Sequence, residues 1–401
     1  MAHLSSLLLC DLRDLARAGL LLCFVGGCSS SAATGASSHD ADISPRLDAY
    51  ISLHLDAAAD VSLHLDAKPS SPDGSVDAGP RANGTLGTWS SLAPMPLPRA
   101  NHCAVAASGY LVVIGGNYEP DGGSGFVDID TVNVAPIQGD GSLGAWTQAG
   151  TTPSPVSGCT ATASGDTIYL VDGIYDDTSD QGQVVSAQLS TGGVLGSWTN
   201  LGPLPNGQDA FSTAAWIGSD SAKTLYVMDS ATSVTATLHV PTFPTFGTWV
   251  EDDWLPGFLG RPEYAFTGNY VYAMGGYLST DAGNPSVTAV NGAPVASGGT
   301  VGAPFSTTSL PTDVTFGNGV AVDDWIFVIG GKTGLFTSGV AGTYSASVGA
   351  NGTLGAWQAQ TSLPEGRTDM AVTLAGDFLY LTGGGYMGPG VATVYAARVR
   401  F

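Results

Sequence analysis

The stretch GTLGTW, from Gly84 to Trp89, decides the fold because close copies of it recur along the chain. The copies are GSLGAW ending at Trp146, GVLGSW ending at Trp198, PTFGTW ending at Trp249, a degenerate GTVGAPF ending at Phe305 and GTLGAW ending at Trp357. Their last residues lie 57, 52, 51, 56 and 52 positions apart. A period of this length indicates a repeat architecture, in which each repeat packs on its neighbours.

A second phrase alternates with the first: an apolar run that closes on a glycine pair. Its copies are YLVVIGG ending at Gly116, TIYLVDG at Gly173, TLYVMDS at Ser230, YVYAMGG at Gly276, WIFVIGG at Gly331 and FLYLTGG at Gly384. Continuous apolar runs of this length favour a strand that is buried on both faces. Glycine permits the positive φ of a tight exit from such a strand.

Each repeat of about 53 residues is interpreted as four short strands. An inner strand such as HCAVAA, from His102, precedes the apolar run, and an alternating strand such as DTVNVAPI, from Asp130, follows it. The tryptophan phrase forms the outer strand. A single four-stranded sheet with two apolar faces cannot be stable alone, but stacking such sheets around an axis covers both faces. The sequence therefore predicts an all-β propeller with six blades.

The two ends of the repeat region complement each other. The chain stops at Phe401 after the alternating strand VATVYAARVRF, so the sixth repeat lacks its tryptophan strand. The first strand, GTLGTWSSL from Gly84, has no repeat before it. We expect this N-terminal strand to close the last blade, because closure removes an open sheet edge that would otherwise pair with other chains.

The repeats resemble the kelch repeat, in which a glycine pair is followed by an aromatic outer strand. The resemblance covers Gly84 to Phe401, with departures at Asp229-Ser230 and at Phe305 in the third and fourth repeats. It implies a six-bladed kelch-like β-propeller over residues 83–401.

The N-terminus has the pattern of an export signal. Arg13 and Arg17 precede a short apolar run that ends in VGGC at Cys28. The last four residues resemble the bacterial lipobox, although Val replaces the usual Leu. The resemblance implies a signal peptide over residues 1–27 and a lipid on Cys28, with Ser29 matching the outer-membrane sorting pattern. A plain secretory signal is the alternative.

Residues 28–82 are rich in Ser, Ala, Asp and Pro, and contain the short repeats ISPRLDA, ISLHLDA and VSLHLDA. These repeats are too short and too polar to bury a core. We interpret this segment as a disordered low-complexity tether that holds the propeller away from the membrane. His54 and His64 recur with the repeat and are too few to form a metal site.

The charge balance excludes nucleic acid as a partner. The chain has 12 Lys and Arg against 34 Asp and Glu, for a formal charge of −22. Nucleic-acid binding depends on basic residues that neutralise phosphates, and an acidic surface repels them. We expect contact with the membrane only through the lipid anchor, and a monomer.

Cys103 and Cys159 lie in the inner strands of neighbouring repeats. In an oxidising compartment they either form a disulfide or remain two buried thiols, depending on whether their Cα atoms come within about 7 Å. No cysteine or histidine spacing matches a zinc site, so no metal and no cofactor is predicted.

The connections from each tryptophan strand into the next inner strand carry the candidate ligand-binding residues, since such loops emerge around the axis of a propeller. These candidates are Arg99, Asn101, His102, Asp209, Arg261, Glu263, Tyr264, Glu365, Arg367 and Asp369. The alternative is that the arginines pair with carboxylates and tie neighbouring blades together. As ligand contacts they would favour an acidic sugar or a carboxylate-bearing peptide, because arginine binds carboxylates through two hydrogen bonds.

No catalytic motif is present in the repeat region. A copper oxidase resembling galactose oxidase needs two histidines near a Tyr–Cys pair, but only His102 and His239 occur there, in different repeats. We therefore expect a cell-surface binding scaffold for a protein or glycan, located at the outer membrane. The alternatives are a sugar-processing enzyme resembling the kelch-like sialate mutarotases, with acid–base residues among the candidates, and a purely structural envelope protein.

Overall fold

A computed structural model describes most of the chain beyond residue 81. The described residues are 82–120, 125–171, 183–204, 214–217, 225–228, 234–238, 249–253, 255, 259–278, 284–296, 300–334, 337–385 and 390–401. The predicted signal peptide and tether, Cys28, Asp209 and the Asp229-Ser230 departure lie outside them. The described residues belong to one compact unit, Ser75–Phe401.

Every strand of the described residues belongs to an antiparallel sheet, and six of these sheets have four strands. Sheet 1 contains β2 (Cys103–Ala107), β3 (Tyr110–Ile114), β6 (Thr131–Pro136) and β7 (Thr147–Thr151), with the small pair β4 (Asn117–Tyr118) and β5 (Val127–Asp128) beside it. Sheet 2 contains β8 (Thr160–Ser164), β9 (Thr167–Val171), β10 (Gln183–Gln188) and β11 (Thr199–Pro203). Sheet 3 contains β12 (Ala214–Ile217), β13 (Leu225–Met228), β14 (Val234–Leu238) and β15 (Trp249–Asp253).

The second half of the chain continues the same order. Sheet 4 contains β16 (Glu263–Phe266), β17 (Tyr270–Met274), β18 (Val290–Pro294) and β19 (Phe305–Ser306). Sheet 5 contains β20 (Asn318–Val322), β21 (Trp325–Ile329), β22 (Thr343–Ser347) and β23 (Gln358–Ala359). Sheet 6 contains β24 (Ala371–Ala375), β25 (Phe378–Thr382), β26 (Val394–Arg398) and β1 (Ser90–Ser91). Among the described residues no helix is long and apolar enough to span a membrane.

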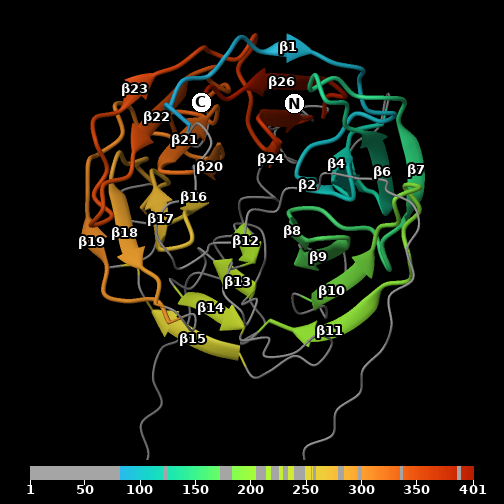
Figure 1. Ribbon diagram of the computed structural model, residues 1–401, viewed down its shortest axis with the longest axis horizontal. Helices are drawn as coiled ribbons and strands as arrows, with labels where there is room; N and C mark the ends of the chain where they lie inside the picture. The colour runs from blue at the N-terminus through green and yellow to red at the C-terminus, as the bar shows by residue number, and fades with distance from the viewer. Residues whose placement is uncertain are drawn as a thin grey trace, which may run out of the picture. The chain divides into compact units, whose positions relative to one another are not determined.

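The sheets follow one another around a common axis (Figure 1). Inner strand β2 packs beside β8 and β24, β8 packs beside β12, and β20 packs beside β16 and β24. Sheets 3 and 4 share an apolar cluster in which Met228 packs with Val271, and beside it the rings of Tyr226 and Phe266 have centroids 5.0 Å apart. The all-β propeller arrangement predicted from the repeats is therefore confirmed.

The core lies between adjacent sheets, as the repeat pattern requires. The apolar run of β3 is buried along nearly its whole length, whereas the inner strand β2 alternates buried and half-buried residues. Between sheets 1 and 2 Val112 packs with Ile168, and between sheets 5 and 6 Phe327 packs with Leu379. Each sheet thus depends on both neighbours for its burial.

The N-terminal strand closes the last sheet, as predicted. Ser90 pairs with Ala396 and Ser91 with Tyr395, both in antiparallel register. Upstream, the Asn83 N–H donates to the Arg400 carbonyl at 2.9 Å. The outermost strand of sheet 6 is therefore supplied by residues more than 300 positions earlier in the chain.

The recurring tryptophans join each sheet to the one before it. Four indole N–H groups donate to backbone carbonyls in or just after the outer strand of the preceding sheet. The pairs are Trp89 with Thr361 at 3.1 Å, Trp146 with Ala93 at 3.0 Å, Trp198 with Thr151 at 2.8 Å and Trp357 with Thr308 at 3.0 Å. Trp89 therefore occupies in sheet 6 the place that the other three occupy in their own sheets.

The glycine of the tryptophan phrase is required for a close contact that the sequence analysis did not identify. At Gly84 the φ angle is 75°, and a Cβ atom there would lie 2.1 Å from the Trp325 ring at the start of β21. The equivalent glycines meet the first aromatic of the second strand in the preceding sheet, pairing Gly141 with Phe378, Gly193 with Tyr110 and Gly352 with Tyr270. The phrase thus carries two inter-sheet contacts, one through glycine and one through tryptophan.

Candidate functional site at the mouth of the central cavity

A cavity of about 460 Å³ lies between the inner strands β2, β8, β16, β20 and β24. Five residues at corresponding positions ring the end of this cavity where the strands begin, and we call them the collar. They are Asn101, Gly158, Arg261, Phe316 and Asp369, and each lies two positions before the first residue of its inner strand. All five have left-handed backbone angles, with φ between 50° and 67°.

Four collar residues adopt this conformation without being glycine. A left-handed conformation costs a non-glycine residue of the order of 1–3 kcal/mol, and most of all a bulky residue such as Phe316. Backbone hydrogen bonds between neighbouring sheets compensate: Gly158 donates to Asn101 at 2.7 Å, Asn101 to Asp369 at 3.0 Å and Asp369 to Phe316 at 3.2 Å. Four of the collar residues therefore form a hydrogen-bonded arc, and Arg261 is held separately by the Thr315 hydroxyl, which donates to its carbonyl at 3.0 Å.

The side chains of the collar combine opposite charges with an aromatic ring. Arg261 Nη1 lies 3.9 Å from Asp369 Oδ1, and the arginine side chain is 22% exposed while the aspartate is 4% exposed. The Arg261 guanidinium also lies over the Phe316 ring, 4.6 Å from its centroid. Burial raises the pKa of Asp369, and Arg261 opposes that rise.

Lys332, which the sequence analysis did not single out, lies behind this group. Its Nζ is 3.8 Å from the centroid of the Phe316 ring, and the residue is fully buried. Burial lowers the pKa of Lys332 to about 8, although the Asp369 carboxylate acts in the opposite direction. No sequence pattern pointed to this lysine, because it follows a glycine pair in a connection that the predicted loop face did not include.

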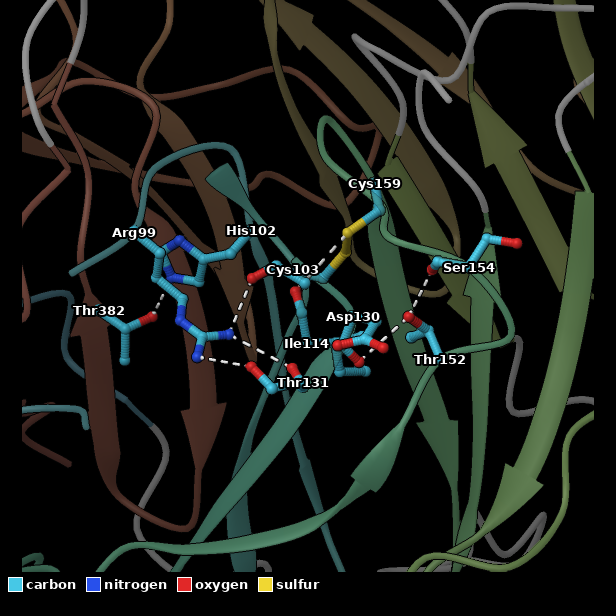
Figure 2. Close-up of a disulfide and its surroundings, with 11 residues drawn as sticks. Arg99, His102, Cys103, Ile114, Asp130, Thr131, Thr152, Ser154, Cys159 and Thr382 are labelled. Carbon is cyan, nitrogen blue, oxygen red and sulfur yellow. Dashed lines mark hydrogen bonds between the residues drawn. A yellow bond between two sulfur atoms is a disulfide. The ribbon is translucent and has the colours of Figure 1, made fainter. Parts of the chain in front are cut away.

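The three candidate arginines do not share one position. Arg99 and Arg367 are equivalent to each other, two residues before the collar, and both are buried. Arg99 donates to the Gly115 carbonyl at 2.8 Å and to Asn133 Oδ1 at 2.7 Å, and burial lowers its pKa to about 10. It also donates to Thr131 Oγ1 at 3.2 Å (Figure 2). Arg261 alone reaches the collar. Arg99 and Arg367 therefore do not line the cavity, and of the three candidate arginines only Arg261 does.

Arg367 and Glu365 form a pair that ties one connection to sheet 6. Arg367 donates to Thr393 Oγ1 at 2.7 Å and to a Glu365 carboxylate oxygen. The same carboxylate accepts a hydrogen bond from the Tyr395 hydroxyl at 2.9 Å. This arrangement matches the structural alternative, in which arginine–carboxylate pairs join the blades.

His102 and Glu263 also line the cavity, but both are buried and already hold structural contacts. His102 Nε2 lies 2.8 Å from Thr382 Oγ1, and burial lowers the pKa of His102 to about 3. Glu263 accepts the Gly317 N–H at 2.8 Å, and burial raises its pKa to about 8. Tyr264, the next candidate, is 5% exposed. At neutral pH both His102 and Glu263 are therefore mainly uncharged.

Cys103 and Cys159 form a disulfide between sheets 1 and 2, with Cα atoms 5.7 Å apart (Figure 2). Cys103 is the first residue of β2, and Cys159 immediately precedes β8. The same pair of positions carries the Glu263–Gly317 hydrogen bond between sheets 4 and 5, and a 3.1 Å bond from Asn318 Nδ2 to the Met370 carbonyl between sheets 5 and 6. One inter-sheet position is thus stabilised covalently in one place and by hydrogen bonds in two others.

Comparisons with known proteins support the architecture and assign no activity. No protein-family model matches the chain, and no curated protein matches its sequence. Solved structures do match its fold, among them one titled "Structure of YjhT", with a TM-score of 0.55 and 13% sequence identity. That match covers 76% of this chain and 95% of the other. At this identity the likeness shows the fold alone.

Proposed function

We propose that this protein is an exported binding protein that takes a protein or glycan ligand at the collar. The observation that carries the proposal is the ring of left-handed, non-glycine residues around the cavity. Residues in sparsely populated backbone conformations persist only where the surrounding structure holds them, and they cluster at active sites and ligand sites. An arginine, an aspartate, an asparagine and a phenylalanine are held there together, and convergent polar groups beside an apolar surface are typical of small-ligand sites.

Binding is favoured over acid–base catalysis by the state of the candidate residues. An enzyme acting on a sugar needs a titratable side chain that reaches the substrate. His102 and Glu263 each hold a hydrogen-bonded contact with a neighbouring sheet, and burial leaves both mainly uncharged near neutral pH. Arg99 and Arg367 are engaged within the protein. The collar keeps only Arg261 and Asp369 as charged groups that line the cavity.

A panel of glycans and peptides presented to the full chain tests this function. We expect ligands captured by the wild type to be lost in Arg261→Asn and in Phe316→Asn, because asparagine tolerates the left-handed backbone while removing the side chain. The matched control is Arg398→Gln, which removes an exposed arginine paired with Asp377. Capture that survives both collar variants would show that the ligand site lies elsewhere.

The export and anchoring of the protein are part of the same proposal. A lipidated Cys28 followed by a flexible tether would present the propeller at the outer membrane, and the glycine pairs and tryptophan phrases support a kelch-type repeat. The Cys103–Cys159 disulfide supports an oxidising compartment, since disulfides persist outside the reducing cytosol.

Substitution of the proposed acylated residue tests the anchor. We expect Cys28→Ala to move the protein from the detergent phase to the aqueous phase in phase partitioning, because a lipid chain supplies the membrane affinity. Cys23→Ala is the matched control and should partition like the wild type. Identical partitioning of Cys28→Ala and the wild type would refute lipidation.

A further inference from the structure

The lining of the central cavity is close to electrically neutral, although the chain as a whole carries a formal charge of −22. The charged members of the lining are Arg261 and Asp369, whose opposite charges lie side by side, and Lys332 adds a positive charge behind the Phe316 ring. Burial keeps His102 and Glu263 mainly uncharged near neutral pH, with pKa values of about 3 and about 8. The lining itself therefore has no excess charge that would attract an anionic ligand, and the positive charge of Lys332 lies behind the ring.

One carboxylate oxygen of Asp369 lacks a hydrogen-bond donor, although a Thr368 hydrogen bond and the charges of Arg261 and Lys332 stabilise the carboxylate. Its side chain is 4% exposed, and Oδ2 has no hydrogen-bond partner among the described residues. The other oxygen, Oδ1, lies 3.9 Å from Arg261 Nη1, which is longer than a hydrogen bond. A buried carboxylate oxygen without a donor is costly, so the site is incomplete as it stands.

A ligand group that meets both members of this pair must accept from Arg261 and donate to Asp369. A hydroxyl group does both, whereas a carboxylate only accepts and would bring a second negative charge against Asp369. Asn101 adds an amide at the same rim, with Nδ2 3.4 Å from Asn117 Oδ1. The Phe316 ring lies against the Arg261 guanidinium and the Lys332 ammonium, so it holds these cations in place beside Asp369.

We propose that the collar binds an uncharged, hydroxyl-rich ligand, a sugar residue of a glycan, through hydroxyl groups held by Asp369 and Arg261. The more exposed Arg261 side chain shifts to admit the ligand to the covered aspartate oxygen. This proposal rests on the collar being the ligand site. It replaces the acidic sugar or carboxylate-bearing peptide expected from the arginines alone.

Titration of the full chain with simple sugars tests the proposal. The probes are methyl glycosides of glucose, galactose, mannose and N-acetylglucosamine, with galacturonate and N-acetylneuraminate as acidic counterparts, each followed by calorimetry. The key variant is Asp369→Asn, because asparagine keeps the left-handed backbone and the shape of the side chain but removes the charge. Asp377→Asn makes the same change in the exposed pair with Arg398 and serves as the control.

We expect at least one neutral glycoside to bind, with a dissociation constant at least tenfold higher in Asp369→Asn and unchanged in Asp377→Asn. The expected loss follows from removal of a hydrogen bond to a charged acceptor. Binding of acidic sugars alone, strengthened in Asp369→Asn, would overturn this inference while leaving the collar as the ligand site. Failure of every sugar to bind would also overturn the proposal of an uncharged sugar ligand. The proposed function itself would be overturned only if the ligands captured from the panel also bound the Arg261→Asn and Phe316→Asn variants.

Discussion

Replacing Trp89 with alanine is expected to lower the free energy of unfolding by about 3–5 kcal/mol, the usual cost of removing a buried aromatic side chain. Trp89 is 6% exposed and packs in the apolar cluster between sheets 5 and 6. Its indole N–H also donates to the Thr361 carbonyl at 3.1 Å, so the substitution leaves that acceptor without its partner. Trp89→Phe keeps most of the apolar contact and should recover most of the loss. Chemical denaturation followed by tryptophan fluorescence measures the difference.

Deletion of Asn83–Leu92 should have a still larger effect, because it removes the outer strand of sheet 6 and exposes the edge of β26. Deletion of Ser29–Asp77 is the matched control, since that segment is the proposed tether and should leave the melting temperature nearly unchanged. If both deletions melt alike, the N-terminal strand does not close the ring, and the pairing of Ser90 with Ala396 is not important for stability.

The architecture was predictable because each repeat carries the same residue types at the positions that contact the preceding sheet. The tryptophan and the glycine of the repeated phrase both contact the preceding sheet. Replacing either residue would remove a contact between two sheets. Period and residue type were therefore enough to place the strands and the closing N-terminal segment. The aromatic partners of the glycines, such as Trp325, could not be identified from the sequence. The first residue of an apolar strand gives no sign of whether it contacts the next sheet.

The collar was not predictable to the same degree. Arg99, Arg261 and Arg367 lie in loops of similar sequence, and a difference of two residues in register decides which side chain reaches the cavity. The left-handed conformation of Arg261 and Phe316 has no signal in residue type, because glycine or asparagine is the usual choice there. Inter-sheet hydrogen bonds accompany that conformation, from the Asp369 N–H to the Phe316 carbonyl and from the Thr315 hydroxyl to the Arg261 carbonyl, and they form only once the sheets are assembled.

The disulfide shows the same limit. The sequence predicts that the two cysteines lie in corresponding inner strands. In the structure Cys103 is the first residue of β2, whereas Cys159 lies one residue before β8, so the two positions differ by one residue. This offset faces them toward each other across the interface of sheets 1 and 2, with Cα atoms 5.7 Å apart. Strand boundaries predicted from sequence are uncertain by more than one residue. An offset of one residue decides whether the two cysteines face each other, so the sequence could not distinguish a disulfide from two thiols.

Loss of the Cys103–Cys159 disulfide is expected to lower the free energy of unfolding by about 4 kcal/mol, because the bond closes a loop with a sequence separation of 56 residues and restricts the unfolded chain. The double substitution Cys103→Ser and Cys159→Ser tests this in urea denaturation, with the wild type in reductant as a second measure. Both should show a similar loss.

Thiol counting decides whether the bond is present. In a variant with Cys10, Cys23 and Cys28 changed to serine, the remaining two cysteines should give no titratable thiol under denaturing, non-reducing conditions and two after reduction. Two thiols before reduction would mean that the bond is absent, and the double substitution should then leave urea stability almost unchanged. A bond confirmed by thiol counting but worth less than about 1 kcal/mol would instead mean that the reduced, unfolded chain keeps structure that already restricts it.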